Sequence, residues 1–148
     1  LEHRVFYPLR DPQPVLQLLI YPATDLRAVA PSHVTNGQGY LLTRDSIAYY
    51  TCHYLGDADP AHARASPLLA ARHDGLAPAL VLTAGFDPLR DEGRQYADAL
   101  SAAGTRCEYV CFERQIHGFI TMGRVIAEAN TAVDLCAAAL RRAFAAAG

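Results

Sequence analysis

The sequence predicts an α/β fold built on a parallel sheet, and three apolar runs support this prediction. They are VLQLLIY at 15–21, ALVLTAG at 79–85 and the segment 107–112. Nearly continuous apolar runs of this length are typical of strands buried on both faces. Long intervals with helical patterns separate the runs, which suits crossover connections between parallel strands and excludes hairpins.

The composition is that of one globular domain. The 148 residues are 51 % hydrophobic and 19 % charged, and they contain no internal repeat and no dividing linker. Residues 1–14 do not fit the pattern, because Pro8, Pro12 and Pro14 interrupt any helix there. We therefore interpret 1–14 as an atypical N-terminal segment, whose native or non-native origin stays open, and 15–148 as the domain.

The interval between the first two strands is expected to hold a surface loop and a helix. The segment 27–42 is polar and contains glycine, so we place it at the surface. Thr43 is a typical helix N-cap and Gly56 is a typical stop, which predicts a helix from 43 to about 55. Ile47, Tyr50 and Tyr54 lie at helical spacing within it.

A second helix is expected directly after the second strand. Pro88 stands where the first helical turn tolerates proline, and Asp91 and Glu92 place negative charge near the positive end of the helix. Tyr96 and Leu100 supply its inward face. These signals predict a strand, a turn and a helix in succession.

A last helix is predicted from about 124 to 147. An apolar stripe of this kind faces the core by default. The stripe comprises Ile126, Ala129, Val133, Cys136, Leu140 and Phe144.

Charge and cysteine content exclude several classes of function. The net charge of −2 and the pI near 6.3 leave no basic stripe, so nucleic acid is not an expected partner. The four cysteines form no CxxC and do not pair with histidines at ligand spacing, so we expect free thiols and no metal. No apolar stretch approaches the roughly 20 residues that span a bilayer. We therefore expect a cytoplasmic protein.

The ends of the second and third strands carry the residues with chemical potential. Asp87 follows ALVLTAG and Phe86, and His117 follows the third strand by a short loop. Because loops at the carboxyl ends of parallel strands converge, an acid and an imidazole would meet at one edge of the sheet. A carboxylate that accepts the Nδ1 proton of a histidine lets Nε2 act as a base. The alternatives are that Asp87 is only a helix cap and that His117 is a structural histidine, although Gly118 permits a tight turn beside it.

Several segments of the chain form a recognisable series. They are LIYPATDL at 19–26, YLLT at 40–43, SPLLA at 66–70, APALVLTAGFDPLRDEGRQYADALSAAG at 77–104 and IHGF at 116–119. In the same order along the chain, these segments resemble the hormone-sensitive-lipase-like α/β-hydrolases, which are bacterial esterases and lipases. The DPLRDEG and HGF segments are the most specific of them, and the resemblance runs from about residue 15 to the end of the chain.

The resemblance implies that 15–148 is the C-terminal half of an α/β-hydrolase domain, with three parallel strands and flanking helices. It implies that Asp87 is the acid of a catalytic triad and His117 the general base. Asp25, Asp91 and Glu92 would be structural, the last two by shaping the turn and capping the helix. No cofactor is implied, and the expected substrate is a small carboxylic ester.

The nucleophile of this family is missing from the sequence. The family carries its serine in a GxSxG motif and its oxyanion hole in an HGG motif further upstream, and neither occurs here. The serines are Ser32, Ser46, Ser66 and Ser101, and none has the flanking glycines. We therefore expect the isolated chain to be inactive and the nucleophile-bearing half to lie elsewhere.

Three functions follow as hypotheses. The first is a serine carboxylic ester hydrolase completed by a serine outside this chain. The second is an inactive fragment that acts only as an assembly or interaction module, either as a homo-oligomer or by pairing with a missing N-terminal half through the strand at 15–21, whose open edge would be adhesive. The third keeps the hydrolase fold but cleaves peptides or lactones, and the DPLRDEG wording favours esterases over it.

Overall fold

The computed structural model describes residues 14–147, and within them three strands form one parallel sheet in the order β1-β2-β3. This confirms the predicted α/β class. The strands are β1 (Gln17–Ile20), β2 (Ala79–Phe86) and β3 (Cys107–Ile116). The first strand is shorter than predicted, and the third continues four residues beyond its predicted end. The N-terminal segment 1–14 lies, apart from its last residue, outside the described residues.

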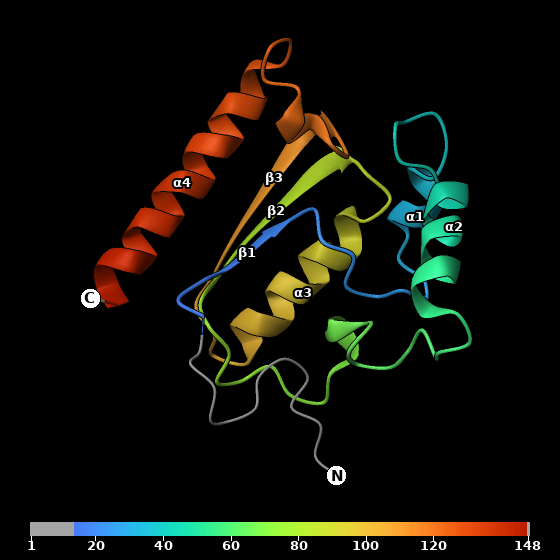
Figure 1. The fold of residues 1–148 in the computed structure, drawn as a ribbon, viewed down its shortest axis with the longest axis horizontal. Helices are drawn as coiled ribbons and strands as arrows, with labels where there is room; N and C mark the ends of the chain where they lie inside the picture. The colour runs from blue at the N-terminus through green and yellow to red at the C-terminus, as the bar shows by residue number, and fades with distance from the viewer. Residues whose placement is uncertain (1–13, 148) are drawn as a thin grey trace.

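Helices cover both faces of the sheet, with α4 on one side and α3 on the other (Figure 1). The α-helices are α1 (Ser32–Thr35), α2 (Arg44–Leu55), α3 (Arg90–Ala102) and α4 (Ala127–Ala147), and the 3₁₀ turns are η1 (Pro67–Leu69) and η2 (Phe119–Thr121). Successive residues of β2 point to opposite faces, so Leu80 and Leu82 face α4 while Ala79 and Val81 face α3. The central strand is therefore buried on both sides, as its apolar sequence predicts.

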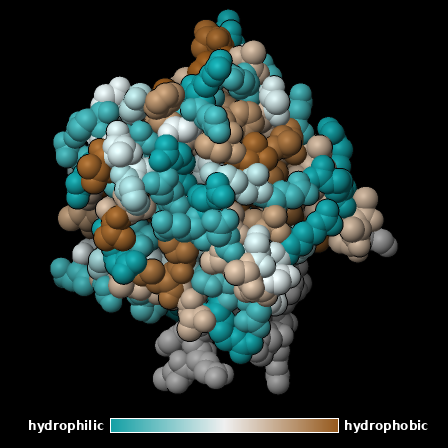
Figure 2. Space-filling model, turned by 180° about the vertical axis from the view of Figure 1, so that it is seen from behind, coloured by the Kyte–Doolittle hydropathy of each residue, from teal (hydrophilic) through white to brown (hydrophobic). Residues whose placement is uncertain are grey.

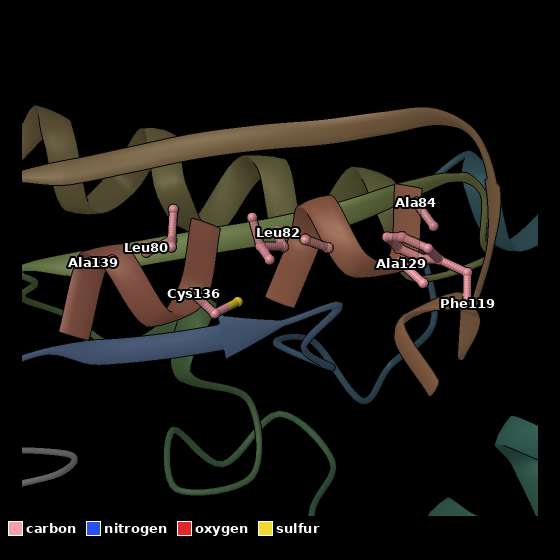
Figure 3. Close-up of a cluster of buried hydrophobic side chains, with 8 residues drawn as sticks. Leu80, Leu82, Ala84, Phe119, Ala129, Cys136 and Ala139 are labelled. Carbon is pink, nitrogen blue, oxygen red and sulfur yellow. The ribbon is translucent and has the colours of Figure 1, made fainter. Parts of the chain in front are cut away.

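The core beneath α4 is built from small helix residues (Figure 3). The predicted apolar stripe of this helix is partly wrong, because Val133 and Phe144 are exposed. Alanines allow the helix to approach the sheet closely, whereas the sequence pattern scores hydrophobicity without regard to size. The buried face consists of Ala129, Ala132, Cys136 and Ala139.

The helix α3 matches its prediction more closely. Tyr96 and Leu100 are buried against β2, and Asp91 and Glu92 lie in its first turn. The cap differs from the expectation, since the N-cap residue is Leu89 and the Asp91 amide donates instead to the Ser32 hydroxyl at 3.1 Å. Glu92 is buried and its carboxylate is directed to other partners.

The helix α2 begins and ends as predicted. Thr43 accepts a hydrogen bond from the Ser46 amide at 3.2 Å, and Gly56 terminates the helix. No residue of α2 is buried, and Tyr50 and Tyr54 are largely exposed although their spacing is helical. The spacing of apolar residues predicts a helix, but it does not predict whether another element packs against that helix.

The segment 27–42 is not a simple surface loop. Ser32, His33 and Asn36 are buried, and they form or follow α1, which lies beside the start of α3. A polar segment is expected to be solvated, but here the Ser32 hydroxyl, His33 Nε2 and the Asn36 amide find hydrogen-bond partners inside the protein.

No helix within the described residues has the length and apolarity needed to cross a membrane. On the face shown in Figure 2, hydrophobic atoms form separate groups among hydrophilic ones. That face therefore carries no single extended apolar patch.

Candidate active site

The pairing of β2 with β3 brings Asp87 and His117 together. Phe86 pairs with Ile116 at the end of the ladder, so the next residue of each strand is Asp87 on one and His117 on the other. The imidazole Nδ1 lies 2.8 Å from Oδ2 of Asp87. The expectation that two adjacent strands deliver an acid and an imidazole to one edge is confirmed.

This alignment depends on an irregularity in β3. Ala84 pairs with Phe112, but two residues later Phe86 pairs with Ile116, so β3 contains two extra residues at this point. A regular ladder would have placed Gln115 opposite Asp87. The close approach requires Gly85, because a Cβ there would overlap the carbonyl oxygen of Glu113.

Asp87 is sealed from solvent while His117 reaches the surface. The Asp87 side chain is 0 % exposed and that of His117 is 26 % exposed. The other carboxylate oxygen of Asp87, Oδ1, accepts the Leu89 amide at 2.8 Å. Asp87 thus orders the turn before α3 and also binds the imidazole, so the cap alternative describes only half of its contacts.

The turn after His117 is anchored on both sides. Gly118 has a φ of 83°, which favours glycine, and it opens the η2 turn as the sequence suggests. Phe119 in this turn is buried in the core beneath α4. The side chain of Gln115 donates a hydrogen bond to Glu128 at the start of α4, which ties the end of β3 to that helix.

Asn36 is a residue of this region that sequence reasoning missed. Its side-chain amide donates to the carbonyl oxygens of Gly85 and Asp87, each at 3.2 Å. The two acceptors are 49 and 51 residues away in sequence, so no local signal could reveal the contact. Asn36 therefore helps to hold the backbone that carries Asp87.

Glu92 forms a second carboxylate–histidine pair with His33. Its Oε2 lies 2.6 Å from His33 Nε2, and both side chains are 1 % exposed. Its Oε1 accepts the amides of Thr24 and Asp25 at 2.7 and 3.1 Å. Glu92 is structural, as the resemblance implies, but it joins three segments instead of capping α3.

The other two acids that the resemblance implies to be structural are also paired. Asp91 accepts the Ser32 amide at 2.9 Å and the Arg90 guanidinium at 2.8 Å. Asp25 is buried and binds Arg27 through both carboxylate oxygens. The hydrogen bonds from Arg27 hold the pKa of Asp25 below its ordinary value.

A pocket of about 520 Å³ opens beside His117. Its lining is mainly apolar, and it joins the base to the otherwise exposed helix α2. The lining includes His117, Leu26, Leu42, Ile47, Tyr50 and Tyr54. An apolar pocket with a few polar groups is the usual form of a small-molecule site.

Each of the four serines has a hydrogen-bond partner other than His117. Ser32 and Ser66 are buried and donate to the carbonyl oxygens of Pro88 and Pro60, and Ser101 donates to that of Ala97. The Ser46 hydroxyl bonds that of Thr43. None of these contacts is that of a nucleophile with its base.

Within the described part of the chain, no group of three or more His, Cys, Asp or Glu side chains could hold a metal ion. The four cysteines are free thiols.

Comparison with known proteins extends these observations. A family model described as the α/β hydrolase fold matches residues 2–121. The carboxylic ester hydrolase LipN of Mycobacterium tuberculosis is 50 % identical over 113 residues, which cover 75 % of this chain and 30 % of LipN. The ethyl acetate hydrolase of Pseudomonas putida is 37 % identical over 130 residues, covering 87 % and 41 %. The chain spans less than half the length of these relatives.

Solved structures of ester-hydrolysing enzymes also superpose on this chain, over less than half of their own length. The thermostable carboxylesterase EstE1, cloned from a metagenomic library, superposes with a TM-score of 0.82 and 37 % identity, covering 86 % of this chain and 45 % of EstE1. An ester hydrolase from the metagenome of Lake Arreo in Spain superposes with a TM-score of 0.82 and 42 % identity, covering 89 % and 42 %.

Proposed function

Because this chain belongs to the α/β-hydrolase family, among the hormone-sensitive-lipase-like bacterial esterases, we propose that it supplies the acid and the base of a serine carboxylic ester hydrolase. The single observation that carries the proposal is the hydrogen bond between buried Asp87 and surface-reaching His117. Two of the relatives carry names that state the hydrolysis of an ester, carboxylic ester hydrolase and ethyl acetate hydrolase.

The geometry suits one sequence of proton transfers. A serine hydroxyl attacks the ester carbonyl carbon, and His117 Nε2 takes the hydroxyl proton. Asp87 accepts the Nδ1 proton in a hydrogen bond and stabilises the imidazolium that forms. His117 then gives its proton to the leaving alcohol. Water releases the acid in a second round that uses the same base.

The nucleophile and the oxyanion donors of this proposal come from residues outside these 148. The apolar pocket beside His117 would receive the organic part of the ester. A small carboxylic ester is therefore the proposed substrate, and no cofactor takes part in the proposed steps.

The open edge of β1 supports a proposal about partners. Among the described strands β1 pairs with β2 alone, which leaves its other edge with unpaired backbone groups. We propose that the segment 15–21 pairs with a nucleophile-bearing half or with a second copy of the chain. A strictly monomeric mass in light scattering at high concentration would exclude the second copy.

The function is tested by adding the missing part. In a completed chimera, the preceding part of a hormone-sensitive-lipase-like relative, with its GxSxG serine, is joined to this chain at residue 15. We expect the chimera to hydrolyse a short-chain p-nitrophenyl ester and the isolated chain to match the buffer rate. A folded chimera without turnover would contradict the proposal. If the isolated chain hydrolyses the ester and His117→Ala abolishes that turnover, the proposal that the serine lies outside these 148 residues is contradicted.

A further inference from the structure

Tyr21 lies against the imidazole of His117. The two ring centroids are 4.4 Å apart, with an angle of 50° between the ring planes. The same tyrosine ring lies 6.2 Å from that of Phe119, which is buried. Tyr21 thus stands between the core beneath α4 and the proposed base. It follows β1 directly, just as Asp87 follows β2 and His117 follows β3.

The backbone of Tyr21 adopts a conformation that is unusual for its residue type. Its φ is 37°, one of two positive values among the non-glycine residues described. Residues held in such conformations persist where the surroundings over-determine them, and they gather at functional sites. Here the Tyr21 amide donates to the Leu82 carbonyl oxygen at 2.6 Å, which fixes the strained residue to β2. The residue with this strained backbone is therefore the one whose ring lies against His117.

The hydroxyl of Tyr21 connects to the same region. Burial raises the pKa of Tyr21, a hydrogen bond with the backbone of Ile120 opposes this rise, and the negative charge of Asp87 adds to it. Ile120 belongs to the η2 turn that follows His117. One side chain therefore contacts the imidazole ring and the turn that carries it.

We propose that Tyr21 is a positioning residue that holds the His117 imidazole with Nδ1 toward Asp87 and Nε2 away from it. The inference rests on the proposed role of His117 as the base. The single hydrogen bond that Nδ1 donates to Asp87 fixes one atom of the imidazole but leaves the ring free to tilt about that bond. Tyr21 removes this freedom by covering part of the ring surface. In a base that is 26 % exposed, such a contact replaces the packing that a buried histidine would have.

Nuclear magnetic resonance of the isotopically labelled 148-residue chain tests the inference without needing turnover. In the wild type we expect His117 in one tautomer, with a slowly exchanging Nδ1 proton that Asp87→Asn removes. His117→Gln assigns the signal. Tyr21→Leu should lose the slow proton and give a mixture of tautomers, whereas Tyr21→Phe keeps the ring and should retain both features. Tyr49→Leu, an exposed tyrosine on α2 outside the lining of the pocket beside His117, is the matched control and should change neither feature.

An unchanged His117 proton and tautomer in Tyr21→Leu would overturn the inference and leave the proposed function standing. A wild-type spectrum in which Asp87→Asn changes nothing would contradict the proposed function itself. If circular dichroism shows that Tyr21→Leu does not fold, Tyr21→Met takes its place. Its flexible side chain also lacks the ring, so the slow proton should again be lost and a mixture of tautomers should again appear. The wild type must also show a nuclear Overhauser effect between the two rings, and its absence would overturn the inference.

Discussion

The two histidine–carboxylate pairs differ in exposure much more than in geometry. Nδ1 of His117 lies 2.8 Å from Oδ2 of Asp87, and Nε2 of His33 lies 2.6 Å from Oε2 of Glu92. Both carboxylates are buried. The His33 ring is 1 % exposed and that of His117 is 26 % exposed, although both histidines contribute to the lining of the pocket at the carboxyl end of the sheet.

The difference shows that pairing alone does not mark a catalytic histidine. The carboxylate of Glu92 also accepts two backbone amides, and its pair joins α1 and the segment after β1 to α3. The Asp87 pair leaves one imidazole nitrogen available to a reactant. We therefore propose a structural role for the sealed pair and proton transfer for the open one, and four substitutions test that division.

The largest expected effect is on turnover. In the completed chimera, Asp87→Asn should lower kcat by about 10⁴, because an amide cannot stabilise the imidazolium and favours the wrong tautomer. Ester hydrolysis by the folded variant is the measurement. Asp98→Asn, which alters an exposed carboxylate on α3, is the control and should leave kcat unchanged. A loss below tenfold would remove Asp87 from the role of triad acid.

The second effect is on stability. His33→Leu should lower the free energy of unfolding by about 3 kcal/mol, because it leaves the buried Glu92 carboxylate without its side-chain partner. His117→Leu also leaves the buried Asp87 carboxylate without its side-chain partner, but it should lower the free energy of unfolding by less, about 1 to 2 kcal/mol, because water can reach that carboxylate at this partly exposed position. Urea denaturation of the chimera followed by circular dichroism measures both values. Equal losses would show that exposure does not separate the two pairs.

A smaller effect than that of His33→Leu is expected from the backbone beneath the open pair. Gly85→Ala should cost about 2 kcal/mol, because the new methyl group meets the Glu113 carbonyl and must displace β3. It should also weaken the His117 signal in the magnetic resonance experiment while leaving that of His33 intact. Gly104→Ala, whose φ is 80° and whose added Cβ would meet open space, is the control. Gly104→Ala should lower the stability through backbone strain alone and leave the His117 signal unchanged. A change of the His117 signal in both variants would show that the signal follows the loss of stability and not the geometry of the site.

Local signals in the sequence account for the parts of the fold that were predicted. The apolar runs locate all three strands, and Thr43 and Gly56 locate the ends of α2. Asp87 and His117 were predicted from their places after two strands, and the structure brings them into contact. Their catalytic roles remain a prediction.

The parts that were missed depend on contacts between distant segments. The two extra residues of β3 follow from the approach of Gly85 to Glu113, which no pattern within either strand displays. The segment 27–42 is polar and was placed at the surface, yet His33 finds Glu92 59 residues away. The face of α4 was misjudged because periodicity cannot distinguish an alanine that fits the sheet from a phenylalanine that does not.

The most direct test of the central claim is labelling with a fluorophosphonate, which an activated serine attacks at phosphorus with loss of fluoride. Mass spectrometry should find the label on the GxSxG serine of the completed chimera, and His117→Ala should abolish this labelling. The isolated chain should carry no label. Labelling of Ser32, Ser46, Ser66 or Ser101 in the isolated chain, or unchanged labelling of the His117→Ala chimera, would contradict the proposal that His117 activates a serine outside these 148 residues.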